Sequence, residues 1–107
     1  MQGNILIIDD SVIVQTQLQI YCKELNLNCK FVSTLQEVSQ YLERDFYDWI
    51  LLDLNLNGTK VPRSFMEKIK GKVKKLILMS ADFEEYSGFV FLQKPFGVKD
   101  LRIALEL

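Results

Sequence analysis

The sequence predicts an α/β fold built on one parallel β-sheet, and three observations support this prediction. Short apolar runs alternate along the chain with segments in which apolar residues recur at helical spacing. The short runs are apolar without a period of two, as expected for strands that are buried on both faces. The chain has 107 residues, which is enough for one compact domain. We therefore expect residues 1–107 to form a single domain.

Five strands and four helices are expected, and a helix follows every strand except the fourth. The strands are predicted at residues 4–8, 28–32, 48–53, 76–79 and 89–92. The first helix follows Ser11, a good N-cap residue, and runs to about residue 26. The second covers residues 34–44, the third has Pro62 in its first turn and ends at Gly71, and the last covers residues 97–107.

Composition excludes several classes of function. The net charge of −1 argues against a general role at nucleic acids or membrane surfaces. Residues 1–4 lack the basic start of a signal peptide, and no apolar run is long enough to span a bilayer. Cys22 and Cys29 lack metal-type spacing and are expected to be free cysteines in a reducing, cytoplasmic environment. The absence of histidine excludes imidazole catalysis and leaves mainly oxygen ligands for a metal.

Polar residues follow four of the five predicted strands. Asp9 and Asp10 follow the first, Asp53 ends the third, Ser80 the fourth and Lys94 the fifth. Taken singly, Asp53 and Ser80 are better explained as turn or capping residues, and the other three can be explained as capping or surface residues. In a parallel sheet, however, all the carboxyl ends of the strands lie at one edge, where ligands bind in open α/β folds. We therefore expect the five side chains to form one site.

This set of residues suits phosphoryl chemistry. Three neighbouring carboxylates repel one another, and would repel phosphate, unless a cation joins them. Mg²⁺ prefers oxygen ligands and commonly binds through one or two carboxylates, waters and phosphate oxygens. A carboxylate can attack phosphorus to give an aspartyl phosphate, and a lysine and a hydroxyl can stabilise the transferring group. The sequence therefore predicts an Mg²⁺-dependent phosphoacceptor site.

A family resemblance rests on four stretches: I-L-I-I-D-D-S at 5–11, I-L-L-D-L at 50–54, L-I-L-M-S-A at 76–81, and Lys94-Pro95-Phe96. Together they resemble the receiver domains of two-component response regulators, over nearly the whole chain. The resemblance implies a doubly wound five-stranded sheet of order 2-1-3-4-5. It also implies that the chain takes a phosphoryl group from a histidine kinase or a histidine phosphotransfer protein. Such a domain is a signalling phosphoacceptor rather than an enzyme, with only self-phosphorylation and self-dephosphorylation.

The resemblance assigns roles to the acidic residues. Asp53 would be the phosphoacceptor and a metal ligand. Asp10 would bind Mg²⁺ directly and Asp9 through water, and the backbone carbonyl of Asn55 would complete the protein ligands.

The resemblance also assigns roles around the phosphoryl group. Ser80 and Lys94 would contact it, and the Lys94–Pro95 peptide bond is expected to be cis. Ser80 and Phe91 would form a two-state switch, in which Ser80 moves inward and Phe91 rotates into the vacated space. From the residues alone, Phe91 is equally well explained as part of the core.

Two features depart from the family. The usual Met-Pro-Gly stretch after the phosphoacceptor is absent, and residues 54–58 read Leu-Asn-Leu-Asn-Gly. Residues 81–88 replace a full helix between the fourth and fifth strands, so helix four is expected to be shortened or missing. Eight extended residues reach about 26 Å, which is enough to return along a strand. Loss of that helix would expose Phe89 and Phe91, so a partner protein or a second copy is expected to cover the strand-five face.

The residues also allow three alternatives to a phosphoacceptor receiver domain. A pseudo-receiver would keep the fold and bind proteins without phosphorylation. A haloacid-dehalogenase-type phosphohydrolase would need Asp-x-Asp after its first strand, where this chain has Asp9-Asp10. A flavin-binding flavodoxin-like domain would need a phosphate-cradling loop there, and the two carboxylates would repel the flavin phosphate.

Overall fold

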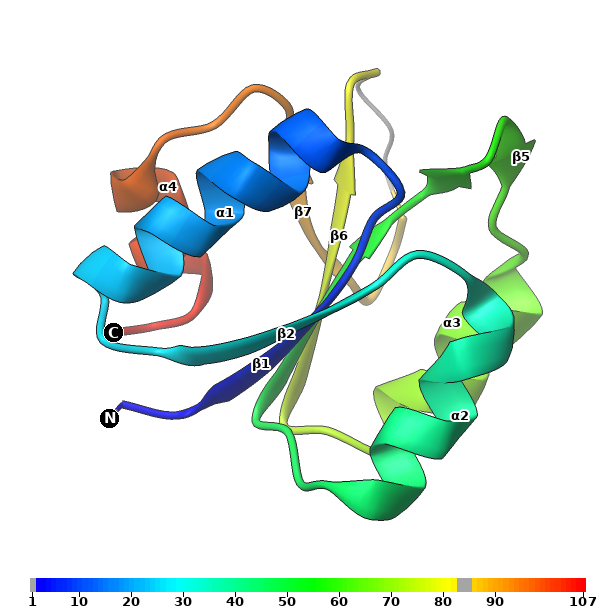
Figure 1. Cartoon of the computed structure of the whole chain (residues 1–107). Helices are drawn as coiled ribbons and strands as arrows, with labels where there is room; N and C mark the ends of the chain where they lie inside the picture. Colours follow the sequence, from blue (N-terminus) through cyan, green and yellow to red (C-terminus); the bar gives the residue numbers. More distant parts are fainter. Residues whose placement is uncertain (1, 83–85) are drawn as a thin grey trace.

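A five-stranded parallel sheet forms the middle layer of the computed structural model, which describes residues 2–82 and 86–107 (Figure 1). Its strands are β1 (Asn4–Ile8), β2 (Asn28–Val32), β3 (Trp49–Asp53), β6 (Lys75–Ser80) and β7 (Val90–Gln93). Their order is β2-β1-β3-β6-β7, and every neighbouring pair is parallel. Because β6 and β7 are the fourth and fifth strands of this sheet along the chain, the predicted order 2-1-3-4-5 is confirmed.

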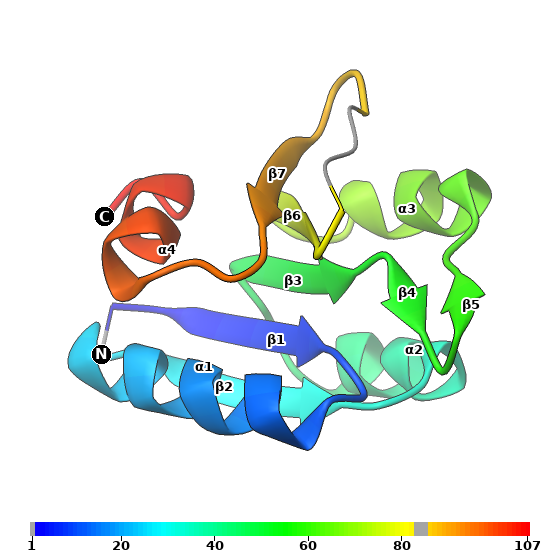
Figure 2. The same cartoon turned by 90° about the horizontal axis from the view of Figure 1, so that it is seen from above.

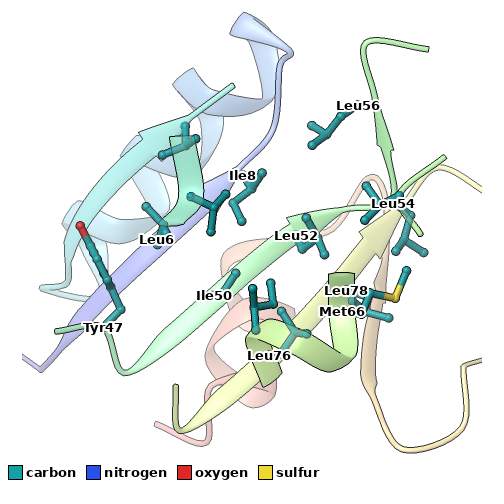
Figure 3. Packing of buried hydrophobic residues seen from close by; sticks show 14 residues of the cluster. Leu6, Ile8, Tyr47, Ile50, Leu52, Leu54, Leu56, Met66, Leu76 and Leu78 are labelled. Atoms are coloured by element: carbon teal, nitrogen blue, oxygen red, sulfur yellow. The ribbon is translucent and has the colours of Figure 1, made fainter. Parts of the chain in front are cut away.

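Two helices cover each face of the sheet (Figure 1). The helices α1 (Val12–Glu24) and α4 (Val98–Ala104) lie on one face, and α2 (Leu35–Arg44) and α3 (Arg63–Lys70) on the other. Alternate residues of each strand point to opposite faces, so β1 contributes Ile5 and Ile7 to one core cluster and Leu6 and Ile8 to the other. Figure 3 shows the cluster beneath α2 and α3. Within residues 2–82 and 86–107, none of the helices has the length and apolar character needed to span a bilayer.

Most helix ends follow the sequence, with small differences. Ser11 is the N-cap of α1, and its hydroxyl accepts a hydrogen bond from the Val14 N–H at 3.3 Å. Pro62 is the N-cap of α3 rather than part of its first turn, because its ψ of 143° is extended. Gly71 caps α3 as predicted.

The last helix is shorter than the predicted span of residues 97–107. It ends at Ala104, and Glu106 has a left-handed φ of 60°. The Leu107 N–H returns to the Arg102 carbonyl at 3.1 Å, which closes the helix end. The Glu106 carboxylate also pairs with Lys75 at 2.8 Å, which holds the turned segment against the sheet.

A small antiparallel hairpin follows β3. It consists of β4 (Asn55–Leu56) and β5 (Thr59–Lys60), joined by Asn57 and Gly58 with φ angles of 52° and 76°. Positive φ at both turn residues is typical of the two-residue type I′ hairpin, which favours Asn-Gly. The turn was predicted from the sequence, but the hairpin was not, because its strands have two residues each. Figure 2 shows it beyond the end of β3.

The connection from β6 to β7 has no helix among its described residues, which are 81, 82 and 86–89. Residues 83–85 of the predicted connection lie outside the described residues. The prediction that helix four is shortened or missing therefore agrees with the described part of the chain.

Phe89 and Phe91 are less exposed than expected. Both rings are half-buried and pack against the core cluster beneath α2 and α3. The Lys70 ammonium lies 4.5 Å from the Phe89 ring centre, the Arg63 guanidinium lies 5.4 Å from it, and Lys70 also donates to the Gly88 carbonyl at 2.7 Å. Basic side chains of α3 thus cover part of the Phe89 ring.

Candidate functional site

Three carboxylates meet at the carboxyl edge of β1 and β3. Asp9 and Asp10 follow β1 directly, and Asp53 is the last residue of β3. One carboxylate oxygen of each residue lies within 4.8 Å of the others. Asp9 and Asp53 are buried, whereas Asp10 is exposed. Because β1 and β3 are neighbours in the sheet, its topology alone brings these residues together.

This arrangement fits a hard divalent cation. Two oxygens bound to one Mg²⁺ at about 2.1 Å lie at most about 4.2 Å apart. The three carboxylates of Asp9, Asp10 and Asp53 need only a small adjustment from their 4.8 Å spread, or a bridging water, to meet that requirement. The residues present therefore fit the predicted metal.

Lys94 links two of the carboxylates. Its ammonium lies 2.9 Å from Asp9 Oδ2 and 3.2 Å from Asp53 Oδ2. The Lys94 N–H donates to the Ser80 carbonyl at 2.7 Å, and the Lys94–Pro95 peptide bond is cis. Burial alone would lower the pKa of Lys94, but the hydrogen bonds and charges of Asp9 and Asp53 raise it above its usual value. Lys94 therefore stays cationic.

Asp53 bears its charge at an energetic cost. Burial raises the pKa of Asp53, and the charge of Asp9 raises it further. The Asn55 N–H, which donates to Asp53 Oδ1 at 3.1 Å, and the Lys94 ammonium lower it, but the net shift is upward. Without a metal, the site therefore favours the protonated Asp53 more than water does.

The other two carboxylates are held by backbone groups. Asp9 Oδ1 accepts a hydrogen bond from the Ser11 N–H at 2.8 Å, and Asp10 Oδ2 accepts one from the Asn57 N–H at 3.2 Å. The Gln15 side chain also donates to the Asp9 carbonyl at 2.6 Å. The contacts of Gln15 and Asn57 were not predicted, although the Asn-Gly pair was a signal for a tight hairpin near the site.

The hairpin leaves the Asn55 carbonyl outside its own hydrogen-bond ladder. The Val61 N–H donates to the Leu54 carbonyl at 2.7 Å, and Asn55 is paired with Lys60. Hydrogen-bonded and non-hydrogen-bonded pairs alternate in an antiparallel ladder, so the Asn55–Lys60 pair is a non-hydrogen-bonded one. The carbonyl is therefore available to a ligand, and its role as a metal ligand stays a prediction.

Ser80 and Phe91 lie where the sequence places them. Ser80 is buried at the end of β6, and its hydroxyl accepts a hydrogen bond from the Asp82 N–H at 3.2 Å. Phe91 pairs with Leu78 in the sheet and points toward the face covered by α2 and α3. Contact of Ser80 with a phosphoryl group, and a switch that couples it to Phe91, stay predictions.

Proteins similar to this chain are found among solved structures. No family model matches the sequence, and no curated protein matches it. Among solved structures, the chain is similar to a two-component response regulator from Clostridium difficile, with 21% identity, 98% of this chain and 93% of that chain covered, and a TM-score of 0.84.

Two further structures support the same fold. The receiver domain of sensor histidine kinase PA1611 from Pseudomonas aeruginosa PAO1 is 23% identical, with 99% and 96% coverage and a TM-score of 0.83. That structure has a magnesium ion coordinated in its active site cleft. The chemotaxis response regulator CheY4 of Vibrio cholerae is 15% identical, with 99% and 98% coverage and a TM-score of 0.82. The chain therefore has the fold of a response-regulator receiver domain.

Proposed function

We propose that this chain is a phosphoacceptor receiver domain that takes a phosphoryl group onto Asp53 with the help of Mg²⁺. One observation carries the proposal: the carboxylates of Asp9, Asp10 and Asp53 converge within 4.8 Å, and Lys94 reaches two of them. The phosphodonor is a histidine kinase or a histidine phosphotransfer protein. The domain then acts as a signalling component rather than as an enzyme that turns over a separate substrate.

Different residues of the site would bind the metal and accept the phosphoryl group. Asp9, Asp10, Asp53 and the Asn55 carbonyl would hold Mg²⁺, which neutralises charge on the phosphoryl oxygens. A carboxylate oxygen of Asp53 forms a bond to phosphorus while the phosphorus–nitrogen bond of the donor phosphohistidine breaks. The electron pair of that bond stays on the imidazole nitrogen.

Lys94 and Ser80 would stabilise the group that is transferred. The Lys94 ammonium is already 3.2 Å from Asp53 Oδ2, so it can contact a phosphoryl oxygen bound there. The Ser80 hydroxyl, at the end of the adjacent strand, can donate a hydrogen bond to another. In the present structure that hydroxyl accepts a hydrogen bond from the Asp82 N–H, which leaves its own hydrogen available for donation.

Intact mass spectrometry tests the proposal directly. The parent chain and Asp53→Asn are incubated with acetyl phosphate and Mg²⁺, with and without a chelator. We expect one added phosphoryl group on the parent chain, and none on Asp53→Asn or after chelation. If no adduct forms, binding of beryllofluoride would indicate fast turnover. Failure of both would instead identify a pseudo-receiver.

The outer face of α1 is the surface that we propose for the phosphodonor protein. Val12, Ile13 and Ile20 are 74%, 82% and 57% exposed, although they are large and apolar. With Thr16 and Gln17 they line a shallow hollow of about 410 Å³. Since α1 begins two residues after Asp10, this apolar face adjoins the proposed site.

Ile13→Ser is expected to slow phosphotransfer from a phosphorylated histidine phosphotransfer protein by about tenfold, because an exposed apolar contact is lost at the docking surface. Phosphorylation by acetyl phosphate should be unchanged, since that small donor needs no docking surface. Gln19→Ser, at another exposed position on α1, is the matched control. The donor is selected from a panel by its rate with the parent chain, and equal slowing with both donors would contradict this assignment.

A further inference from the structure

Asp10 differs from Asp9 and Asp53 in the contacts of its carboxylate. Lys94 pairs with Asp9 and Asp53, which are buried. Asp10 is exposed, yet one of its oxygens lies within 4.8 Å of those of the other two carboxylates. Repulsion between like charges would turn an exposed, unrestrained carboxylate toward water. Some contact must therefore keep Asp10 at the site.

The backbone N–H of Asn57 supplies such a contact. It donates to Asp10 Oδ2 at 3.2 Å from the tip of the β4–β5 hairpin. The left-handed φ of 52° at Asn57 is one that asparagine tolerates better than most residues, and it is part of the turn that directs this N–H. A proline at position 57 could not make the bond, because proline has no N–H.

The hairpin tip is also fixed on its other side. The Asn57 side-chain amide lies 3.5 Å from the Ser33 carbonyl, in the segment after β2. Leu56 and Val61 are buried in the core cluster and anchor the base of the hairpin. In Figure 2 the hairpin lies beyond the arrowhead of β3, at the edge where the chain leaves β1. The Asn57 N–H is therefore presented from a supported element.

We infer that the Asn57 N–H is a positioning group for the metal site, which holds Asp10 beside Asp9 and Asp53 before the metal binds. The same hairpin presents the carbonyl of Asn55, so one short element orients two metal-binding groups. This inference rests on the proposed Mg²⁺-dependent function. It also gives a role to residues 54–58, which replace the usual Met-Pro-Gly stretch.

The sharpest test replaces the Leu56–Asn57 amide by an ester through chemical ligation, because this change removes the Asn57 N–H and keeps every side chain. It also weakens the Leu56 carbonyl as an acceptor in the Leu56–Thr59 pair, so retention of the hairpin is checked by NMR. The matched control is an ester at the neighbouring Asn57–Gly58 bond. Binding of Mg²⁺ alone is measured by NMR titration. We expect about tenfold weaker binding in the first ester and a change below about twofold in the control, as for other groups that orient metal ligands.

Two simpler variants separate the N–H from the side chain. Asn57→Gly keeps the N–H and tolerates positive φ, so its Mg²⁺ affinity should stay within about twofold of the parent value. Asp10→Ala should shift the Asn57 amide proton resonance upfield in the metal-free protein, which reports the hydrogen bond without any activity measurement. An unchanged resonance would overturn the inference.

The outcomes distinguish this inference from the proposed function. If the parent chain fails to bind Mg²⁺, the proposed function falls and the inference falls with it. If the parent chain binds Mg²⁺ and both esters bind it equally well, only the positioning role of Asn57 is overturned. If Asn57→Gly loses affinity while the first ester keeps it, the side-chain contact with Ser33 is responsible and the N–H is not.

Discussion

Lys94→Met is expected to lower the free energy of unfolding by about 3–5 kcal/mol at pH 7 without divalent cations. The substitution removes the ammonium that lies 2.9 Å from Asp9 and 3.2 Å from Asp53, and it leaves two buried carboxylates without that partner. Methionine fills a similar volume, so the loss reports charge rather than packing. Urea denaturation followed by circular dichroism gives the measurement.

The loss should depend on pH in a defined direction. Burial and Asp9 already raise the pKa of Asp53, and removal of Lys94 raises it further. An acid whose pKa is higher in the folded state favours folding when it is protonated, and this contribution is lost as the pH rises through that pKa. The deficit of Lys94→Met should therefore be larger at pH 7 than at pH 4.5. Lys99→Met, at an exposed position of α4, is the control, and equal or pH-independent losses would contradict the role assigned to Lys94.

Gly3→Ala is expected to cost about 2 kcal/mol, for a reason unrelated to the site. A Cβ atom at residue 3 would lie 2.6 Å from the Trp49 ring and 2.8 Å from the Asp48 carboxylate. Neither neighbour moves freely, because Trp49 is buried and Asp48 Oδ2 accepts a hydrogen bond from the Asn4 N–H at 2.9 Å. The φ of 156° at Gly3 adds backbone strain.

Thermal and urea unfolding measure this second effect. Gly71→Ala is the matched control, because a Cβ atom there meets nothing within 4 Å and the residue has a helical φ of −78°. We expect the control to change stability by less than about 0.5 kcal/mol. Mg²⁺ binding should be the same in Gly3→Ala as in the parent chain, since Gly3 precedes β1 and Asp9 follows it. A loss of binding without a loss of stability would contradict this account.

The sheet and the location of the site could be predicted because both follow from buried strands. A strand that is apolar on both faces, such as Trp49–Asp53, has few alternatives to a central place in a parallel sheet. Once the strands are parallel, the residues that follow them share an edge, and so Asp9, Asp53 and Lys94 meet although they are far apart in the sequence.

Contacts between elements could not be predicted in the same way. The cover over Phe89 comes from Lys70 and Arg63 on α3, and it depends on how far α3 lies from β7. Neither the periodicity nor the composition of α3 predicts the distance between α3 and β7. The hydrogen bond from the Asn57 N–H to Asp10 likewise depends on the geometry of the hairpin. Strands of two residues are too short to be predicted from a sequence pattern.

Trp49 lies far from the acidic site, so its fluorescence does not report on that site directly. It is the only tryptophan in the chain, and it is buried at the first residue of β3, against Gly3. Asp53 is the last residue of the same strand, so four residues of extended chain place the two about 13 Å apart. The intrinsic fluorescence of the protein therefore reports packing at the edge opposite the carboxylates. Changes in emission will follow global unfolding, and occupancy of the acidic edge needs a reporter placed there, such as a fluorophore on the hairpin.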